Sequence, residues 1–286
     1  MHKKIILVAE TGSDIPAALA AENDVFLVPM HVQMGEVTLD DGTFPPEDVC
    51  AYYDRTGKCA TTSASTPYDF TRIFDEIHEK YPEHQILHLA YSAVTTCSYQ
   101  NAVLVSDDRP YVTSVDTKHV SVGQAAVVLA AAKYLKENPD CSVEEAAAFV
   151  EEIRERTQMC FVPKNLDYLR AGGRVSNAAA MVGNLLGLHP CIEIIGGKLM
   201  AQKKYRGTLK KVVPKMIEEF DAKHPLDREH VYLIDTPYLE PDVRALAEET
   251  VKKMGFKAVT WMKTGCVITC HGGPGALGVV GVCPKA

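Results

Sequence analysis

The first 160 residues alternate between apolar strand-like runs and segments with helical apolar spacing, and this alternation limits the possible fold most strongly. The continuous apolar run Ile5–Ala9 is typical of a strand covered on both faces. Further strands are predicted within residues 24–34, 85–91 and 111–121. Helical spacing is clearest from Phe70 to Ile77. Strands alternating with helices predict an α/β fold, with a three-layer α/β/α N-terminal domain and a mainly parallel sheet over residues 1–160.

The pattern changes after about residue 160, where the strands no longer alternate regularly with helices. Gly196 and Gly197 separate two strand-like segments, and such a pair is typical of a type I′ hairpin turn. Three more strands are predicted further on, with helices between them. We therefore predict a second, C-terminal α+β domain over residues 161–286.

Composition limits the classes of partner. The formal net charge of −7 argues against non-specific binding to nucleic acid or anionic membranes, which requires a basic face. We expect no nucleic-acid partner and only transient membrane contact. A chain of 286 residues can bury about three quarters of its unfolded surface, so its core needs no disulfide or metal.

Cysteine usage and the first residues indicate a compartment. None of the nine cysteines forms a C-x-x-C pair, and Cys266, Cys270 and His271 fit no zinc spacing well. We expect free buried thiols, no metal site and no cofactor. The apolar run near the start is too short for a signal peptide or a spanning helix, so we expect a cytoplasmic protein.

Capping residues mark two helix starts. After the first strand, Ser13 or Asp14 is expected to cap a helix whose first turn contains Pro16. Further along the chain, Ser65 or Thr66 is expected to cap the helix that begins near residue 67.

Hydroxyl groups cluster immediately before that second helix. Residues 61–66 hold five Ser or Thr side chains, Thr62 and Ser63 among them. Hydroxyl and N–H donors at a helix N-terminus are suited to an anion. A capping loop without a ligand is the alternative interpretation.

Ser92 lies where a predicted strand ends and a helix begins, the edge of an open parallel sheet at which ligands bind. The surrounding "LAYSAV" lacks the G-x-S-x-G pattern of a hydrolase nucleophile. We therefore expect Ser92 to form hydrogen bonds rather than to attack a substrate.

Two glycine-rich stretches lie in the second half. In "LDYLRAGGRV", Arg170 and Arg174 bracket two glycines, and the nearly uncharged segment that follows is typical of a helix that packs in a core or lines an apolar cavity. In "CHGGPGALG", His271 precedes glycines that allow the backbone to approach a ligand closely. Neither stretch contains the lysine-ended loop that holds nucleotide phosphates.

Five motifs, in this order, carry a resemblance to a known family. They are the Thr62-Ser63 pair with Pro67 in register, the segment from Ser92 to Tyr99-Gln100, "SVDTKHVSVGQ", "LDYLRAGGRV" and "HGGPG". Over nearly its whole length the chain resembles the DegV family of bacterial fatty acid-binding proteins.

The resemblance implies a non-enzymatic carrier, with no catalytic residue and no cofactor. One long-chain fatty acid would lie in a tunnel between two domains, and a separate ATP-dependent fatty acid kinase would convert it to acyl phosphate for phospholipid synthesis. The implied carboxylate ligands are Thr62, Ser63, Ser92, position 93 and His271. Other implied site residues are Arg170, Gly273 and Gly275 around the site and Met181, Leu185 and Leu186 along the tunnel.

The chain departs from the family pattern at Ala93, where the family usually has a second serine. We expect weaker head-group binding, or donors taken from Ser92 or Ser63 instead. The first strand also ends in Glu10, where the family more often has aspartate. Two alternatives stay open: a carrier of another lipid-like ligand, and an acyl hydrolase that uses Ser92 or Thr62 with His271.

Overall fold

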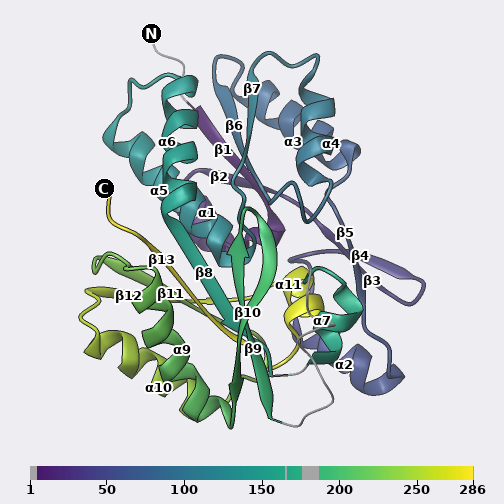
Figure 1. The fold of residues 1–286 in the computed structure, drawn as a ribbon. Helices are drawn as coiled ribbons and strands as arrows, with labels where there is room; N and C mark the ends of the chain where they lie inside the picture. Colours follow the sequence, from purple (N-terminus) through teal and green to yellow (C-terminus); the bar gives the residue numbers. More distant parts are fainter. Residues whose placement is uncertain (1–4, 165, 176–186, 286) are drawn as a thin grey trace.

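A four-stranded parallel sheet forms the centre of the N-terminal half (Figure 1). The computed structural model describes residues 5–164, 166–175 and 187–285. The strand order is β2-β1-β6-β7, and all three pairings are parallel. The strands are β1 (Ile5–Glu10), β2 (Val25–Val28), β6 (Gln85–Ala90) and β7 (Val112–Asp116).

Helices cover both faces of this sheet because both faces are apolar. Ile6, Val8 and Ile86 pack with the helices α3 (Pro67–Lys80) and α4 (Ser98–Ser106). Their neighbours in the strands, such as Leu7 and Leu87, face α5 (Ser121–Glu137) and α6 (Val143–Arg156). This arrangement confirms the three-layer α/β/α architecture predicted from the alternation of strands and helices.

A small antiparallel sheet lies beside the parallel one and was not predicted. Its order is β4-β3-β5, formed by β3 (His31–Met34), β4 (Val37–Asp40) and β5 (Thr61–Ser63), with α2 (Glu47–Thr56) between β4 and β5 in the chain. The single strand region expected over residues 24–34 is therefore two strands in different sheets. The hydroxyl-rich loop before α3 is partly strand β5, and Thr66 caps α3 with a capping box.

The start of α1 (Ala17–Glu22) differs from the expectation that Ser13 or Asp14 caps it. Pro16 is its N-cap and makes no side-chain capping bond. A short 3-10 turn, η1 (Thr11–Ser13), intervenes, and Asp14 follows it in the left-handed region with φ of 59°. The carboxylate of Asp14 instead accepts hydrogen bonds from Ser121 and Gly265.

A six-stranded mixed sheet forms the centre of the C-terminal half, in the order β10-β9-β8-β13-β11-β12. Its strands are β8 (Thr157–Val162), β9 (Leu188–Ile195), β10 (Lys198–Arg206), β11 (His230–Asp235), β12 (Ala258–Lys263) and β13 (Leu277–Val282). The helices α9 (Leu209–Lys223) and α10 (Pro241–Lys253) pack on one face. The domain boundary proposed at residue 160 falls within β8 and stays a prediction.

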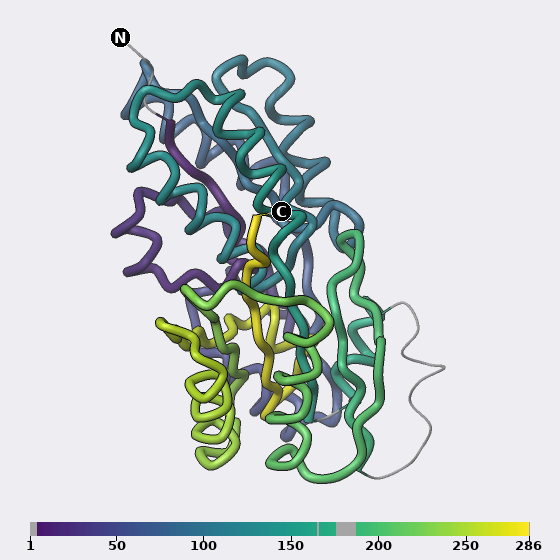
Figure 2. Tube along the Cα trace, turned by 60° about the vertical axis from the view of Figure 1, so that its left-hand side comes forward, coloured from purple at the N-terminus to yellow at the C-terminus, as the bar shows by residue number. Residues whose placement is uncertain are grey.

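The β9–β10 hairpin reaches from this sheet to the N-terminal half, as both views show (Figures 1 and 2). Gly196 and Gly197 form its turn with φ of 54° and 81°, which confirms the predicted hairpin, since a type I′ turn needs positive φ at both positions. The tip is fixed at Ser92, whose hydroxyl donates to the carbonyl of Gly197 over 2.8 Å.

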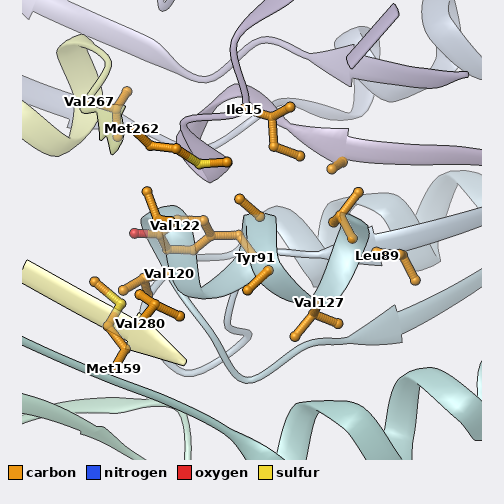
Figure 3. Close-up of a cluster of buried hydrophobic side chains, with 14 of the residues drawn as sticks. Ile15, Leu89, Tyr91, Val120, Val122, Val127, Met159, Met262, Val267 and Val280 are labelled. Carbon is orange, nitrogen blue, oxygen red and sulfur yellow. The ribbon is translucent and has the colours of Figure 1, made fainter. Parts of the chain in front are cut away.

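One apolar cluster joins the two halves (Figure 3). Tyr91, which follows β6, lies at its centre, and Val120 and Val122 come from the N-terminal half. Met159 and Val280 belong to the six-stranded sheet and pack on the same cluster. In the described part of the chain, no helix combines the length and apolar character needed to cross a membrane.

A buried polar cluster fixes the end of β1. The Glu10 carboxylate accepts from the Tyr91 amide over 2.8 Å and from the Gln124 side chain over 2.8 Å. Its other oxygen lies 3.4 Å from Nε2 of His88, and both side chains are fully buried. Glu10 thereby holds the segment that carries Tyr91 into the apolar cluster.

Glu10→Ala is expected to lower the free energy of unfolding by about 1–3 kcal/mol, because it leaves buried polar partners of the carboxylate unpaired. Urea unfolding measures this. Asp75→Ala is the control, since the Asp75–Arg109 pair lies partly exposed and such pairs contribute about 0–1 kcal/mol. If both variants lost the same free energy of unfolding, the buried cluster would stabilise the fold no more than the partly exposed pair does.

Candidate functional site

An apolar cavity lies between the ends of the parallel strands and the six-stranded sheet. It holds about 920 Å³ of space free of protein atoms, the solvent at its opening included. Tyr91 and Val120 line it from the N-terminal half, and Phe161, Leu199 and Ile234 line it from the six-stranded sheet. A largely apolar wall with a few polar groups is typical of a site for a small organic ligand.

The polar part of the wall is formed where β5 meets α11 (Cys266–Gly272). Thr62 and Ser63 line the cavity from β5, and His271 and Gly272 line it from the end of α11. The Thr62 hydroxyl lies 2.9 Å from Nε2 of His271. The structure thus brings together three of the implied ligand residues, Thr62, Ser63 and His271.

The ring of His271 is neutral at pH 7. Burial, together with the smaller effect of the positive charge of Arg174, lowers its pKa to about 4. Nδ1 is buried and has no hydrogen-bond partner among the described residues. A proton on Nδ1 would be an unpaired buried donor, so we assign the proton to Nε2, which then donates to Thr62. The hydrogen of the Thr62 hydroxyl is left for a ligand.

Two glycines keep this histidine in place. A Cβ on Gly172, at the end of α7 (Leu166–Gly172), would overlap Nδ1 of His271. Gly273 follows α11 with φ of 68°, and a Cβ there would lie 2.7 Å from the ring of Tyr168 on α7. The two helices pack against each other because these positions lack side chains.

Gly275, the other implied loop residue, also has a structural reason for lacking a side chain. Its amide donates to the carbonyl of Pro237 over 2.8 Å, and its φ is 74°. A Cβ there would lie 2.6 Å from the side chain of Lys164. Gly275 therefore fixes the loop after α11.

Arg174 is the cation that sequence reasoning missed. The family resemblance implies Arg170 as a site residue, but Arg170 is exposed on α7 and does not line the described wall of the cavity. Arg174 does line it, and its guanidinium donates to the carbonyl of Gly172 over 2.9 Å. Both arginines flank the same glycine pair, so the sequence alone did not distinguish them.

Ser92 and Ala93 lie away from the cavity wall as far as the structure describes it. The Ser92 hydroxyl is used by the hairpin turn, and the Ala93 amide donates to Asp116 over 3.2 Å. Thr95 and Thr96, a little further along, line the cavity instead. Their hydroxyls belong to the motif that pointed to Ser92, yet residue type gave no means of choosing among them.

Three expected tunnel residues, Met181, Leu185 and Leu186, lie outside the described residues. Within residues 5–164, 166–175 and 187–285, no group of three or more His, Cys, Asp or Glu side chains is arranged to hold a metal ion.

The contacts do not assemble a hydrolase relay in the described residues. Ser92 donates to a backbone carbonyl rather than to His271. Thr62 does contact Nε2 of His271, but Nδ1 has no carboxylate partner there. A nucleophile activated by a histidine requires both contacts. The arrangement instead offers a neutral donor network and one nearby cation beside an apolar cavity.

Comparison with known proteins places the chain in a family. The family model described as "Uncharacterised protein, DegV family" matches residues 4–283. The chain belongs to the DegV family. The resemblance inferred from the five sequence motifs is thereby confirmed.

Several DegV relatives are described by what they bind. A solved structure from Thermus thermophilus, titled for fatty acid binding of a DegV family protein, is 27% identical, has a TM-score of 0.88 and covers 98% of this chain and 100% of its own. A DegV lipid-binding protein from Thermotoga maritima is 26% identical, with a TM-score of 0.84 and coverage of 99% and 100%. A fatty acid-binding protein from the same organism is 26% identical and covers 96% of each chain.

His271 is expected to titrate near its lowered pKa of about 4 in the folded protein. Because the unfolded pKa is about 6.5, this residue favours folding above pH 6.5 and loses that contribution as the pH falls towards 4. Ring ¹⁵N and ¹³C chemical shifts, followed from pH 7.5 to 4, measure the titration. Protonation near pH 6.5 in the folded state would contradict the neutral assignment, and the urea-unfolded protein is the control.

Proposed function

We propose that this protein binds a single long-chain fatty acid, with the tail in the apolar cavity and the carboxylate beside Thr62. The observation that supports this most strongly is the Thr62–His271 contact in the wall of a mainly apolar cavity. Relatives of the same family that are described as fatty acid-binding proteins support the choice of ligand.

The tail would provide most of the affinity. Each buried methylene contributes about 0.8 kcal/mol, so roughly 14 methylenes gain on the order of 11 kcal/mol before ordering costs. After a loss of several kcal/mol for ordering, micromolar to nanomolar binding remains. The mainly apolar lining of the cavity suits such a tail.

The head group would provide orientation. A carboxylate leaving water must be hydrogen-bonded, and here the Thr62 hydroxyl donates to it while Nε2 of His271 donates to Thr62. Arg174 supplies the compensating positive charge, and Ser63 lies on the same part of the wall. In this proposal His271 acts through Thr62, whereas Ser92 and Ala93 serve the hairpin and the strand end.

The carrier role extends this proposal. By the family resemblance, the bound acid would be presented to a separate ATP-dependent kinase in the cytoplasm, and this chain would perform no chemistry. Lys203 in the hairpin and Lys210 after it give little support to a basic surface that docks an acidic partner. Lys203 pairs with Glu219 and Lys210 with Asp242, so these charges are already matched within the chain.

Palmitate and hexadecanol, titrated calorimetrically into delipidated protein, test the proposal. Wild type is expected to bind one palmitate per chain. Thr62→Val is expected to weaken palmitate binding about tenfold to a hundredfold, because a hydrogen bond to a charged group contributes about 1.5–3 kcal/mol. Hexadecanol binding should change much less, since its head group carries no charge to stabilise.

Thr62→Ser is the matched control, because it keeps the hydroxyl and removes only a methyl group. It should bind palmitate nearly as wild type does. Failure of the wild-type protein to bind palmitate would refute the proposed ligand. Equal weakening of acid and alcohol binding in Thr62→Val would refute the proposed position of the carboxylate.

A further inference from the structure

Two buried aspartates from the N-terminal half hold the beginning of α11. Oδ1 of Asp14 accepts from the amide of Gly265 over 2.6 Å. Oδ1 of Asp41 accepts from the amides of Cys266 and Val267 over 2.8 Å and 3.3 Å. The first amides of a helix have no partner within the helix, and here carboxylates far away in the sequence provide the partners.

The two aspartates are themselves held in place by hydrogen bonds. The Ser121 hydroxyl donates to Oδ2 of Asp14 over 2.5 Å, and the backbone amide of Asp41 donates to the carbonyl of Met30 over 2.8 Å. Asp14 and Asp41 are only 6% and 3% exposed. Met30 and Ser121 also line the cavity, so the supports of α11 and the cavity wall are the same residues.

Holding two acids here is energetically costly. Burial raises the pKa of both, and the neighbouring Asp41 raises the pKa of Asp14 further. A Cβ on Gly265 would lie 3.0 Å from Oδ1 of Asp41 and 3.2 Å from Oδ1 of Asp14, so both oxygens lie beside the same glycine. A single serine or asparagine at the N-cap is the usual way to begin a helix. Two buried carboxylates are a more costly way to begin α11 than one such cap, which indicates a role beyond starting a short helix.

The position of His271 on α11 indicates what that role is. The helix has seven residues, and His271 lies in its last turn. A helix this short moves as one piece, so its beginning and its end shift together. The Thr62–His271 distance of 2.9 Å therefore depends on where the two aspartates place the helix.

We propose that Asp14 and Asp41 are positioning residues for the carboxylate site: by anchoring the start of α11, they hold His271 against Thr62. This rests on the proposed function for its ligand, but the geometry of the Thr62–His271 pair is testable without one. No ligand is assigned to the aspartates themselves.

The test compares Asp41→Ala with wild type by the ratio of palmitate to hexadecanol affinity. Loss of the anchor is expected to lower that ratio about tenfold, because His271 no longer supports the Thr62 donor. Asp41→Asn should restore most of the ratio, because Oδ1 alone accepts from both amides and an asparagine keeps that oxygen. Asp75→Ala, remote from the cavity, is the control.

A double-mutant cycle separates positioning from general destabilisation. In a His271→Ala background, Asp41→Ala should leave the ratio unchanged, since the residue through which it acts is already gone. An equal fall in both affinities, or an undiminished effect in that background, would overturn the proposal. Asp41→Ser, which is too short to reach the amides, provides the same comparison if Asp41→Ala does not fold.

A measurement without ligand tests the positioning role separately from the proposed function. The ring ¹⁵N shifts of His271 report its hydrogen bond to Thr62, and they should change in Asp41→Ala but not in Asp41→Asn. Unchanged shifts in Asp41→Ala would refute positioning. Failure of wild type to bind palmitate would refute only the ligand.

Discussion

The contact between Thr62 and His271 is the interaction on which the site depends. It joins β5 in the N-terminal half to α11 in the C-terminal half, in the wall of the cavity. Because burial keeps the ring uncharged, the histidine is a donor of fixed direction rather than a counterion. The positive charge in the cavity wall is left to the guanidinium of Arg174. His271 thus fixes the direction of the hydrogen bond, and Arg174 supplies the positive charge.

The surrounding fold is arranged to make that contact possible. Glycines at 172 and 273 let α7 pack directly on α11, and the two aspartates fix the other end of α11. Glu10 holds the segment bearing Tyr91, which completes the apolar wall. The hairpin turn is secured to Ser92, so the sheet that forms the opposite wall is attached to the N-terminal half. The result is a mainly apolar cavity with the Thr62–His271 pair in its wall.

Local sequence patterns predicted the features that depend on interactions between residues close together in the chain. The Gly196-Gly197 turn, a cap at Ser65 or Thr66 and the three layers of the N-terminal half all follow from neighbouring residues. Each is present, with Thr66 as the cap. Such patterns did not predict the roles of Ser92, Arg174 and Asp14, because these roles depend on residues far away in the chain. The Ser92 hydroxyl meets a turn in the other half, and Asp14 meets α11 rather than α1. Nothing in their immediate sequence specified those partners.

The most direct test is the ¹³C NMR spectrum of [1-¹³C]palmitate bound to the protein, because it observes the carboxylate itself. The account predicts one bound carboxyl resonance, distinct from free palmitate, that shifts in Thr62→Val and stays close to its wild-type position in Ala93→Ser. Several bound resonances, or a single one that does not respond to Thr62→Val, would contradict a carboxylate held by Thr62 and His271.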